Sequence, residues 1–319
     1  MGEFDLIKRY FSRPARRAVL GVGDDCALLA PTPGMQLAVS SDMLVEGRHF
    51  LSTVSPVLLG HKALAVNLSD LAACGAEPRA FMLSLALPRA DEAWLAGFSQ
   101  GLWALADTFG CELIGGDTTQ GPLNISITVI GDVPTGQALL RSGAQVGDDI
   151  YVSGTLGDAR VALEVFRGNM SVSESVFLST RSRMEQPTPR IDLGVALRGL
   201  ATSAADISDG FLGDLGHILQ ASQVGADIET ALALPLLACA SHLHLPQARQ
   251  LELILSGGDD YELVFTAPAQ CRAQVVAAGL ASHTPITRIG AVREGQGVQL
   301  RDAAGQPMAH QFKSFDHFA

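Results

Sequence analysis

The sequence has no run of about 18 uncharged apolar residues, so we expect no membrane-spanning helix. Its first five residues, Met1–Asp5, are partly acidic and contain no apolar stretch of the kind that directs secretion. Cysteine is also scarce: there are five, an odd number, with no CxxC spacing. We therefore expect reduced thiols in a cytoplasmic protein, packed mostly as small hydrophobic side chains, Cys26 and Cys74 included.

Positive charge is in short supply as well. There are 22 Lys and Arg against 33 Asp and Glu, a net charge of −11, which argues against a nucleic-acid partner. The chain also lacks a Gly-x-x-x-x-Gly-Lys-Ser/Thr phosphate loop and a complete Gly-x-Gly-x-x-Gly after a strand. No Ser-His-Asp or Cys-His arrangement can be argued from spacing, so no residue is assigned as a general base. An acidic protein can still bind anions when metal ions lie between the two.

What the sequence contains is the composition of a globular protein. With 319 residues, 47% of them hydrophobic and 17% charged, the chain is expected to form two domains. Helix and strand signals alternate throughout, which predicts a mixed α/β architecture. Glycine and polar residues gather between Pro134 and Asp148. We therefore predict an N-terminal α/β domain at 1–137, a linker at 138–148 and a C-terminal α/β domain at 149–319.

Capping residues and hydrophobic periodicity define the expected elements. Ser55-Pro56 is typical of a helix start and predicts a helix that runs to about Gly75. Asp91 is expected to cap a second helix, which ends at Gly110. A third helix is expected at Gly210–Ser222, and strands at Met35–Ser40, Ala80–Leu87, Cys111–Ile114, Asn124–Ile130, Asp149–Ser153, Tyr261–Ala267 and Ile286–Val292.

One pattern recurs along the chain: small residues followed by one or two aspartates, where a strand or helix is expected to end. Six segments show it: Gly23-Asp24-Asp25, Ser40-Ser41-Asp42, Asn67-Leu68-Ser69-Asp70, Gly115-Gly116-Asp117-Thr118, Asp206-Ile207-Ser208-Asp209-Gly210 and Ser256-Gly257-Gly258-Asp259-Asp260. Any one alone is best explained as a turn or a helix cap, because Asp, Gly and Ser dominate both.

Six such segments favour a different explanation. Ligands commonly bind at strand ends in α/β proteins, and crowded carboxylates there repel each other by roughly 4 kcal/mol per close pair. Cations relieve that repulsion, and Mg²⁺ prefers hard oxygen ligands together with phosphate oxygens and water. Glycine beside an aspartate also lets the backbone approach a phosphate closely. The pattern therefore predicts a site for several metal ions and a phosphate-containing ligand.

Together and in order, these segments resemble the thiamine-monophosphate kinase family. The resemblance covers nearly the whole chain and is strengthened by Val45-Glu46-Gly47-Arg48-His49-Phe50 and by the terminal Phe315-Asp316-His317-Phe318. The wider superfamily includes aminoimidazole ribonucleotide synthetase and selenophosphate synthetase. The resemblance implies a two-domain aminoimidazole ribonucleotide synthetase-like fold whose N-terminal sheet forms the interface of a homodimer. It also implies ATP and several Mg²⁺ ions, and phosphorylation of thiamine monophosphate to thiamine diphosphate.

The resemblance further implies a role for particular residues of this chain. His49, Asp259 and Phe312 would contact thiamine phosphate, although the family usually has Glu where this chain has Asp259. ATP would be contacted by Gly116, Asp117, Arg141 and Ser208. The implied metal ligands are Asp25, Ser40, Ser41, Asp42, Asp70, Asp117, Asp206 and Asp209.

Two other functions remain open at this stage. One is a different ATP-dependent synthetase of the same superfamily, which would activate another acceptor. The other is a non-catalytic protein that binds divalent metal or nucleotide, in which the aspartates are structural ligands. Purely structural metal sites would not need Arg141, His49 and an aromatic tail, which disfavours the second alternative.

Overall fold

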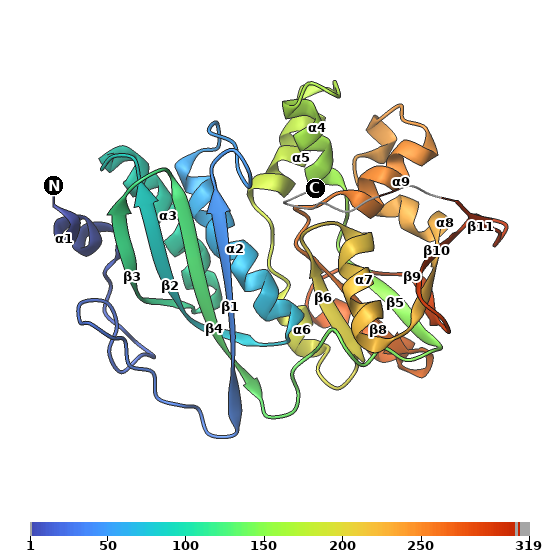
Figure 1. The fold of residues 1–319 in the computed structure, drawn as a ribbon, viewed down its shortest axis with the longest axis horizontal. Helices are drawn as coiled ribbons and strands as arrows, with labels where there is room; N and C mark the ends of the chain where they lie inside the picture. The colour runs from blue at the N-terminus through green and yellow to red at the C-terminus, as the bar shows by residue number, and fades with distance from the viewer. Residues whose placement is uncertain (1, 310–311, 313–319) are drawn as a thin grey trace. The chain divides into compact units, whose positions relative to one another are not determined.

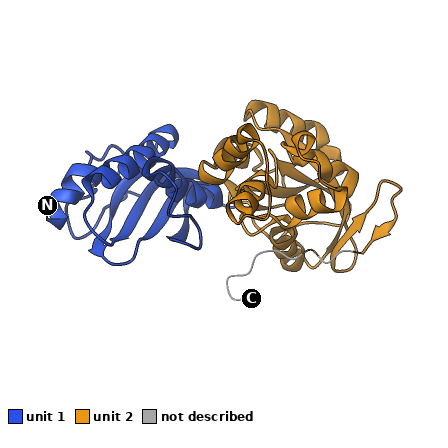
Figure 2. Cartoon of the chain, turned by 90° about the horizontal axis from the view of Figure 1, so that it is seen from above, with its two compact units in different colours: residues 1–71, 76–136 blue, residues 72–75, 137–319 orange. Residues whose placement is uncertain are grey.

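The computed structural model describes residues 2–309 and 312. The chain divides into two compact units, coloured separately in Figure 2: unit 1 is Met1–Leu71 with Ala76–Gly136, and unit 2 is Ala72–Gly75 with Gln137–Ala319. Each unit has its own β-sheet with helices packed on it, so the expected mixed α/β fold is confirmed (Figure 1).

Unit 1 is built on a four-stranded sheet with the order β1-β4-β2-β3. β4 runs antiparallel to both of its neighbours, and β2 pairs with β3 in parallel. A parallel pair requires a crossover connection, which is helix α3 here. The strands are β1 (Met35–Val45), β2 (Glu77–Leu87), β3 (Glu112–Gln120) and β4 (Asn124–Pro134).

Two long helices, α2 (Pro56–Ala73) and α3 (Glu92–Phe109), lie on the same face of this sheet (Figure 1). Asp91 caps α3 by accepting hydrogen bonds from the N–H groups of Ala93 and Trp94, and Gly110 ends the helix with a φ of 58°. These boundaries were predicted from the sequence. The N-terminal segment of unit 1 adds α1 (Glu3–Leu6) and a π-helical turn, η1 (Ile7–Phe11).

Unit 2 contains a seven-stranded sheet with the order β11-β10-β7-β9-β5-β8-β6, mostly antiparallel. Its strands are β5 (Asp148–Ser153), β6 (Ser203–Ile207), β7 (Gly225–Glu229), β8 (Glu262–Pro268), β9 (Ile286–Arg293), β10 (Gly297–Arg301) and β11 (Pro307–Met308). Its helices are α4 (Asp158–Phe166), α5 (Glu174–Glu185), α6 (Ile191–Ala196), α7 (Phe211–Ser222), α8 (Thr230–Ala233), α9 (Gln247–Ser256) and α10 (Arg272–Ala281). Short 3-10 turns are η2 (Leu234–Leu236), η3 (Ala240–His242) and η4 (Ala269–Cys271).

The expectation that every aspartate motif follows the end of an element was wrong for unit 1. β1 was predicted to end at Ser40 but continues to Val45, because it pairs with β4 along its whole length. β3 likewise continues to Gln120, paired with β2. Asp42 and Asp117 therefore lie inside strands. Within the described ranges, no helix combines the length and apolar content that a membrane crossing requires.

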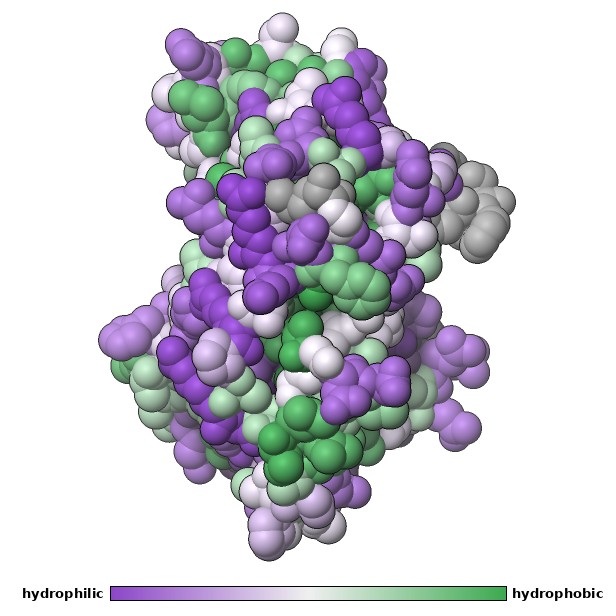
Figure 3. Space-filling model, turned by 90° about the vertical axis from the view of Figure 1, so that its left-hand side faces the viewer, coloured by the Kyte–Doolittle hydropathy of each residue, from purple (hydrophilic) through white to green (hydrophobic). Residues whose placement is uncertain are grey.

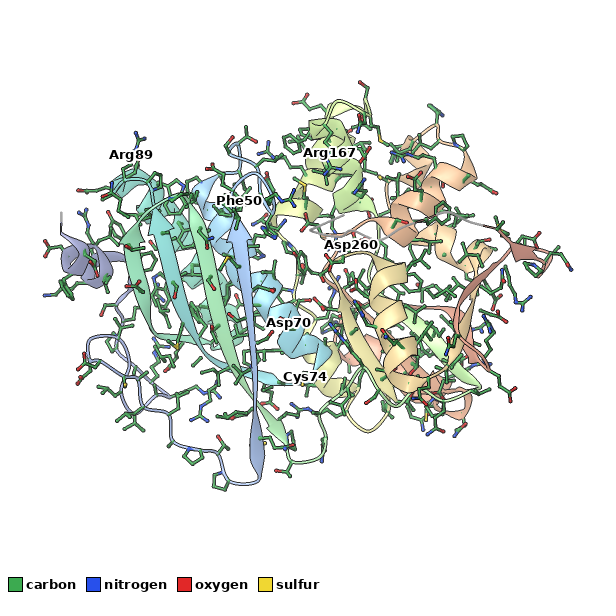
Figure 4. The ribbon with its side chains drawn as sticks, viewed as in Figure 1. Phe50, Asp70, Cys74, Arg89, Arg167 and Asp260 are labelled. Atoms are coloured by element: carbon green, nitrogen blue, oxygen red, sulfur yellow. The ribbon has the colours of Figure 1, made fainter. Side chains whose placement is uncertain are left out.

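All five cysteines are free thiols. Cys111 and Cys239 are buried, and burial raises the pKa of the Cys111 thiol to about 12. The prediction of core packing was wrong for Cys26, which is exposed because the segment before β1 is largely irregular in structure. Cys74, just beyond the end of α2, is half-buried (Figure 4).

Candidate functional site

In unit 1, β1 and α2 bring two of the expected metal-binding residues together. The Ser40 hydroxyl on β1 donates a hydrogen bond to the Asp70 carboxylate on α2, at 2.5 Å (Figure 4 shows Asp70 on the helix). Two residues further along β1, the backbone N–H of Asp42 donates to Asn67 Oδ1 at 2.9 Å. Asn67 is buried and anchored by its own Nδ2, which donates to the carbonyl of Ala63. Helix α2 therefore fixes both Ser40 and Asp42.

Ser41 lies on the opposite face of the sheet from Ser40 and Asp42, because successive side chains of a strand point to opposite faces. Its hydroxyl contacts the Ile127 carbonyl at 3.1 Å and the Thr128 hydroxyl at 3.0 Å, both on β4. The structure thus separates the Ser41 hydroxyl from the side chains of Ser40, Asp42 and Asp70.

Gly116 and Asp117 lie on β3, at one edge of the sheet, while Asp42 lies on β1 at the other. Three steps of about 4.8 Å separate the two backbones, roughly 14 Å in all, so one ion cannot bind both carboxylates. Gly116 is required where it stands: its φ is 140°, and a Cβ there would lie 1.8 Å from the carbonyl oxygen of Leu83. Asp25 is exposed in the segment before β1, where its N–H is bonded to Asp24 Oδ1.

His49 follows β1 in a tight turn that begins at Gly47, where φ is 78°. Its Nδ1 accepts a hydrogen bond from the backbone N–H of Val45 at 3.0 Å. Because Nδ1 is the acceptor, the proton of the neutral ring lies on Nε2. The arrangement therefore makes Nε2 a donor suited to a phosphate oxygen.

In unit 2, the motif from Asp206 to Gly210 joins the end of β6 to the start of α7, as the sequence predicted. Asp206 is buried at the end of the strand, and Ser208 and Asp209 are half-buried in the turn. The carboxylate of Asp214, in the first turns of α7, accepts hydrogen bonds from the N–H groups of Ser208 at 3.1 Å and Asp209 at 3.2 Å. Burial, followed by the negative charge of Asp209, raises the pKa of the Asp214 carboxyl to about 7.

The loop before β8 packs against this turn. The N–H of Asp259 donates to the Ser208 carbonyl at 2.9 Å, and a Cβ on Gly258 would lie 2.5 Å from that same oxygen. Asp259 and Tyr261 have φ values of 68° and 51°, a left-handed conformation that is rare outside glycine. The Tyr261 hydroxyl also donates to Asp259 Oδ1 at 3.2 Å. Such strain often marks functional sites.

Arg141 belongs to the same neighbourhood of unit 2. Its carbonyl accepts a hydrogen bond from the hydroxyl of Ser222, the last residue of α7. The positive charge of Arg141 partly offsets the effect of burial on the pKa of Asp214. The Arg141 side chain is exposed, and its charge favours the ionised form of the carboxyl that holds the Ser208–Gly210 turn.

Phe312 packs, partly buried, against the hydrophobic core of unit 2. The terminal Phe315–Phe318 segment, which contributed to the resemblance, lies outside the described residues.

No group of three or more His, Cys, Asp or Glu side chains in the described part of the chain is arranged to hold a metal ion. The available donors are nevertheless the hard oxygens that Mg²⁺ prefers, carboxylates and hydroxyls, as at Ser40 and Asp70. Because Mg²⁺ is usually bound through one or two carboxylates plus phosphate and water, these residues fit an ion that arrives with a nucleotide.

Three residues that shape the site were not identified from the sequence: Asn67, Asp214 and Tyr261. Asn67 lies in an aspartate motif, but its contact with Asp42 joins residues 25 positions apart. Asp214 looks like an ordinary acid in the first turns of a helix. Only the distinctive Asp-Asp-Tyr after two glycines could have pointed to Tyr261.

Comparisons with known proteins cover both units. Residues 23–133 match the family described as AIR synthase related protein, N-terminal domain, and residues 145–303 match AIR synthase related protein, C-terminal domain. The chain is 46% identical to thiamine-monophosphate kinase of Escherichia coli (strain K12), over 100% of this chain and 98% of that protein.

Solved structures of thiamine-monophosphate kinases are similar to this chain as well. The thiamine-monophosphate kinase of Stenotrophomonas maltophilia K279a superposes with a TM-score of 0.84 at 43% identity, covering 96% of each chain. AaThiL complexed with AMPPCP and TMP superposes with a TM-score of 0.76 at 31% identity, covering 91% of this chain and 89% of that one.

Proposed function

The chain belongs to the thiamine-monophosphate kinase family, and we propose that it phosphorylates thiamine monophosphate with ATP, giving thiamine diphosphate and ADP. The observation that carries this proposal is the 46% identity with the Escherichia coli kinase over 100% of this chain. The complex of AaThiL with AMPPCP and TMP supports the choice of both substrates, because AMPPCP is an analogue of ATP and TMP is the proposed acceptor.

In the proposed reaction, an oxygen of the thiamine phosphate forms a bond to the γ-phosphorus of ATP. The bond from that phosphorus to the β–γ bridging oxygen breaks, and ADP leaves with the electron pair. The second pKa of a phosphate monoester is near 6, so the acceptor is already largely ionised at neutral pH. This is consistent with a site that needs no general base.

Electrostatic repulsion between two polyanions is the main obstacle to this reaction. Mg²⁺, when bound, would neutralise phosphate charge and stabilise the charge that develops during transfer. The residues proposed to hold it are Asp25, Ser40, Ser41, Asp42, Asp70, Asp117, Asp206 and Asp209. Because Asp42 and Asp117 lie on the two edge strands of the unit 1 sheet, we propose that more than one ion would be held.

The chain's own side chains would bind and align the substrates. Arg141 offers a planar guanidinium suited to phosphate, and Gly116 allows the backbone close to the nucleotide. Ser208 would contact ATP through its hydroxyl, because its N–H and carbonyl are both bonded within the protein.

For thiamine phosphate, we propose three contacts. His49 Nε2 would donate to its phosphate, and Phe312 would offer an aromatic face to the cationic thiazolium. Asp259 completes the set, with its carboxylate oriented by Tyr261.

We further propose a homodimer formed through the outer face of the unit 1 sheet. Leu37, Val39 and Met43 on β1 are 53%, 60% and 54% exposed, and Met82 on β2 is 41% exposed. Apolar side chains are visible among polar ones on the face drawn in Figure 3. A run of large exposed hydrophobic residues on one sheet face is typical of a subunit interface.

Light scattering with size-exclusion chromatography tests the dimer. Val39→Glu is expected to convert dimer to monomer, since a charge would be buried in the interface. The matched control is Val276→Glu on α10 of unit 2, at a position 59% exposed, which should leave the mass unchanged. A monomeric wild-type protein, or a dimer that persists in Val39→Glu, argues against this interface.

The five free thiols fit a reducing compartment, and we expect the enzyme to work in the cytoplasm.

The proposed activity is tested by incubating the purified protein with ATP, Mg²⁺ and thiamine monophosphate and measuring thiamine diphosphate. Asp42→Ala and Asp70→Ala should each lower turnover by on the order of 100-fold or more while leaving the protein folded. The matched control is Asp107→Ala, which removes an exposed acid on α3 that pairs with Arg13. Absence of thiamine diphosphate from the wild-type reaction would refute the kinase; normal turnover of both variants at saturating Mg²⁺ would refute the ligand assignment.

A further inference from the structure

The Ser208–Gly210 turn is held from one side by a single carboxylate oxygen. Asp214 Oδ2 accepts the N–H groups of both Ser208, at 3.1 Å, and Asp209, at 3.2 Å. The backbone of Asp214 is tied to the same turn, because its N–H donates to the Gly210 carbonyl at 3.1 Å. Two successive peptide groups are therefore fixed by one side chain.

The other side of the turn is held by the loop before β8. Ser208 O accepts the N–H of Asp259 at 2.9 Å, and Ile207 O accepts the N–H of Tyr261 at 2.8 Å. Gly258 approaches the Ser208 carbonyl so closely that no side chain would fit there. With N–H and C=O both bonded, the backbone of Ser208 is held on both sides, and so is the direction of its Cα–Cβ bond.

Burying the carboxylate of Asp214 at the start of α7 costs free energy. Its side chain is buried, with 4% of the residue exposed, and among the described residues it forms no salt bridge. A buried carboxylate that receives only neutral N–H donors costs free energy that an apolar residue would not. A buried carboxylate at this position is explained if the position of the turn matters for ligand binding.

We propose that Asp214 is a positioning residue for ATP binding: it holds the Ser208–Gly210 turn so that the Ser208 hydroxyl and the Asp209 carboxylate meet the nucleotide and its metal. This role rests on the proposed kinase function. Asp214 itself does not touch ATP, because the hydrogen bonds place its carboxylate on the protein side of the turn. Its loss should therefore weaken nucleotide binding more than acceptor binding, because the loop that carries Asp259 meets the turn through the carbonyl groups of Ile207 and Ser208.

Steady-state kinetics separates positioning from simple stabilisation. Asp214→Ala is expected to raise the KM for ATP about tenfold, and the KM for thiamine monophosphate by less, because the two hydrogen bonds that are lost hold the turn itself. Asp214→Asn keeps an oxygen that can accept both N–H groups, so its KM for ATP should stay near the wild-type value. Asp214→Glu keeps the charge but moves the oxygen by one methylene, and should resemble Asp214→Ala.

Asp158 provides the matched control. It is another buried carboxylate of unit 2, on α4, and it likewise accepts two backbone N–H groups, those of Ala238 and Cys239. Asp158→Ala should lower the melting temperature comparably and leave the KM for ATP unchanged. An Asp214→Ala enzyme that is destabilised like Asp158→Ala but has a normal KM for ATP would overturn the proposal.

A measurement on the wild-type protein covers the case in which Asp214→Ala does not fold. Amide hydrogen exchange at Ser208 and Asp209 should be slow, because both N–H groups are bonded to a buried acceptor. Fast exchange at both positions, or equal KM values for Asp214→Asn and Asp214→Glu, contradicts the proposal. A wild-type protein that makes no thiamine diphosphate would instead refute the kinase, and the exchange rates would still report on the turn.

Discussion

The hydroxyl of Ser40 and the carboxylate of Asp70 lie 2.5 Å apart, joining the strand β1 to the helix α2 through two groups that are both proposed to bind metal. Ser40→Ala removes the donor, and we expect the free energy of unfolding to fall by about 1.5–3 kcal/mol because the hydrogen bond is to a charged group. The half-saturating Mg²⁺ concentration should also rise. Denaturant unfolding and a Mg²⁺ titration of activity measure the two effects.

Ser126→Ala is the control for this change, since Ser126 lies on β4 of the same sheet. It should alter neither stability nor the Mg²⁺ requirement measurably. Equal behaviour of the two variants would remove Ser40 from the proposed ligands.

Two glycine-to-alanine changes should have opposite effects on stability: one at the contact between α2 and α3, and one in α7. A Cβ on Gly60 would lie 2.0 Å from the carbonyl oxygen of Phe98, so Gly60→Ala must push the helices apart and should cost about 1–3 kcal/mol or more. Gly216 lies within α7 with no neighbour near its would-be Cβ, so Gly216→Ala should stabilise by about 0.4–1 kcal/mol. Thermal unfolding distinguishes them, and a shift of the same sign in both would contradict the helix contact.

Local signals account for what was predicted correctly. The limits of α3 follow from Asp91 and Gly110, whose capping depends only on their immediate neighbours. The turn after β6 was likewise readable, because a glycine directly precedes α7. The division into two α/β units follows from the alternation of elements.

Contacts between distant parts of the sequence account for what was not. Asp117 lies inside β3 because its strand pairs with β2, where its partner is Ser84, and no local pattern marks that register. The support that Asn67 gives to Asp42 joins residues 25 positions apart and depends on how α2 packs on β1. Asp214 is only six positions from Ser208, but its contact depends on how the turn folds back on α7. The spacing of motifs alone does not reveal the residues that hold a proposed ligand-binding residue in place.

Asp260 should make the stability of the protein depend on pH. It is buried, and burial raises the pKa of its carboxyl well above the ordinary value of 3.8, while Arg183 lowers it and Asp158 and Glu262 raise it further. The folded protein therefore holds a proton that the unfolded chain releases above pH 3.8. Stability is then lost as the pH rises from 3.8 through the raised pKa.

The change Asp260→Asn isolates this effect, since it removes the titrating group and keeps an oxygen for the N–H of Gly157. The stability of Asp260→Asn relative to the wild type should increase as the pH rises through this window. Urea unfolding at a series of pH values provides the measurement, and a constant difference across the series would show that Asp260 does not titrate there.

Asp259 provides the sharpest test of substrate specificity, because the family usually has glutamate at this position. Asp259→Glu lengthens the side chain by one methylene while keeping its charge. We expect the KM for thiamine monophosphate to be unchanged or lower, with the KM for ATP unaffected. Tyr261→Phe, which removes the hydrogen bond to Asp259 Oδ1, should instead raise the KM for thiamine monophosphate about threefold to tenfold.

The two variants together reveal how Asp259 acts. If the carboxylate reaches the substrate only because Tyr261 orients it, the double variant should behave like Asp259→Glu alone, since the longer side chain no longer depends on the tyrosine hydroxyl. A large loss of activity in Asp259→Glu would show that the shorter side chain is an adaptation of this chain. The left-handed backbone at Asp259 and Tyr261 would then be part of that adaptation, because it determines where the shorter carboxylate can reach.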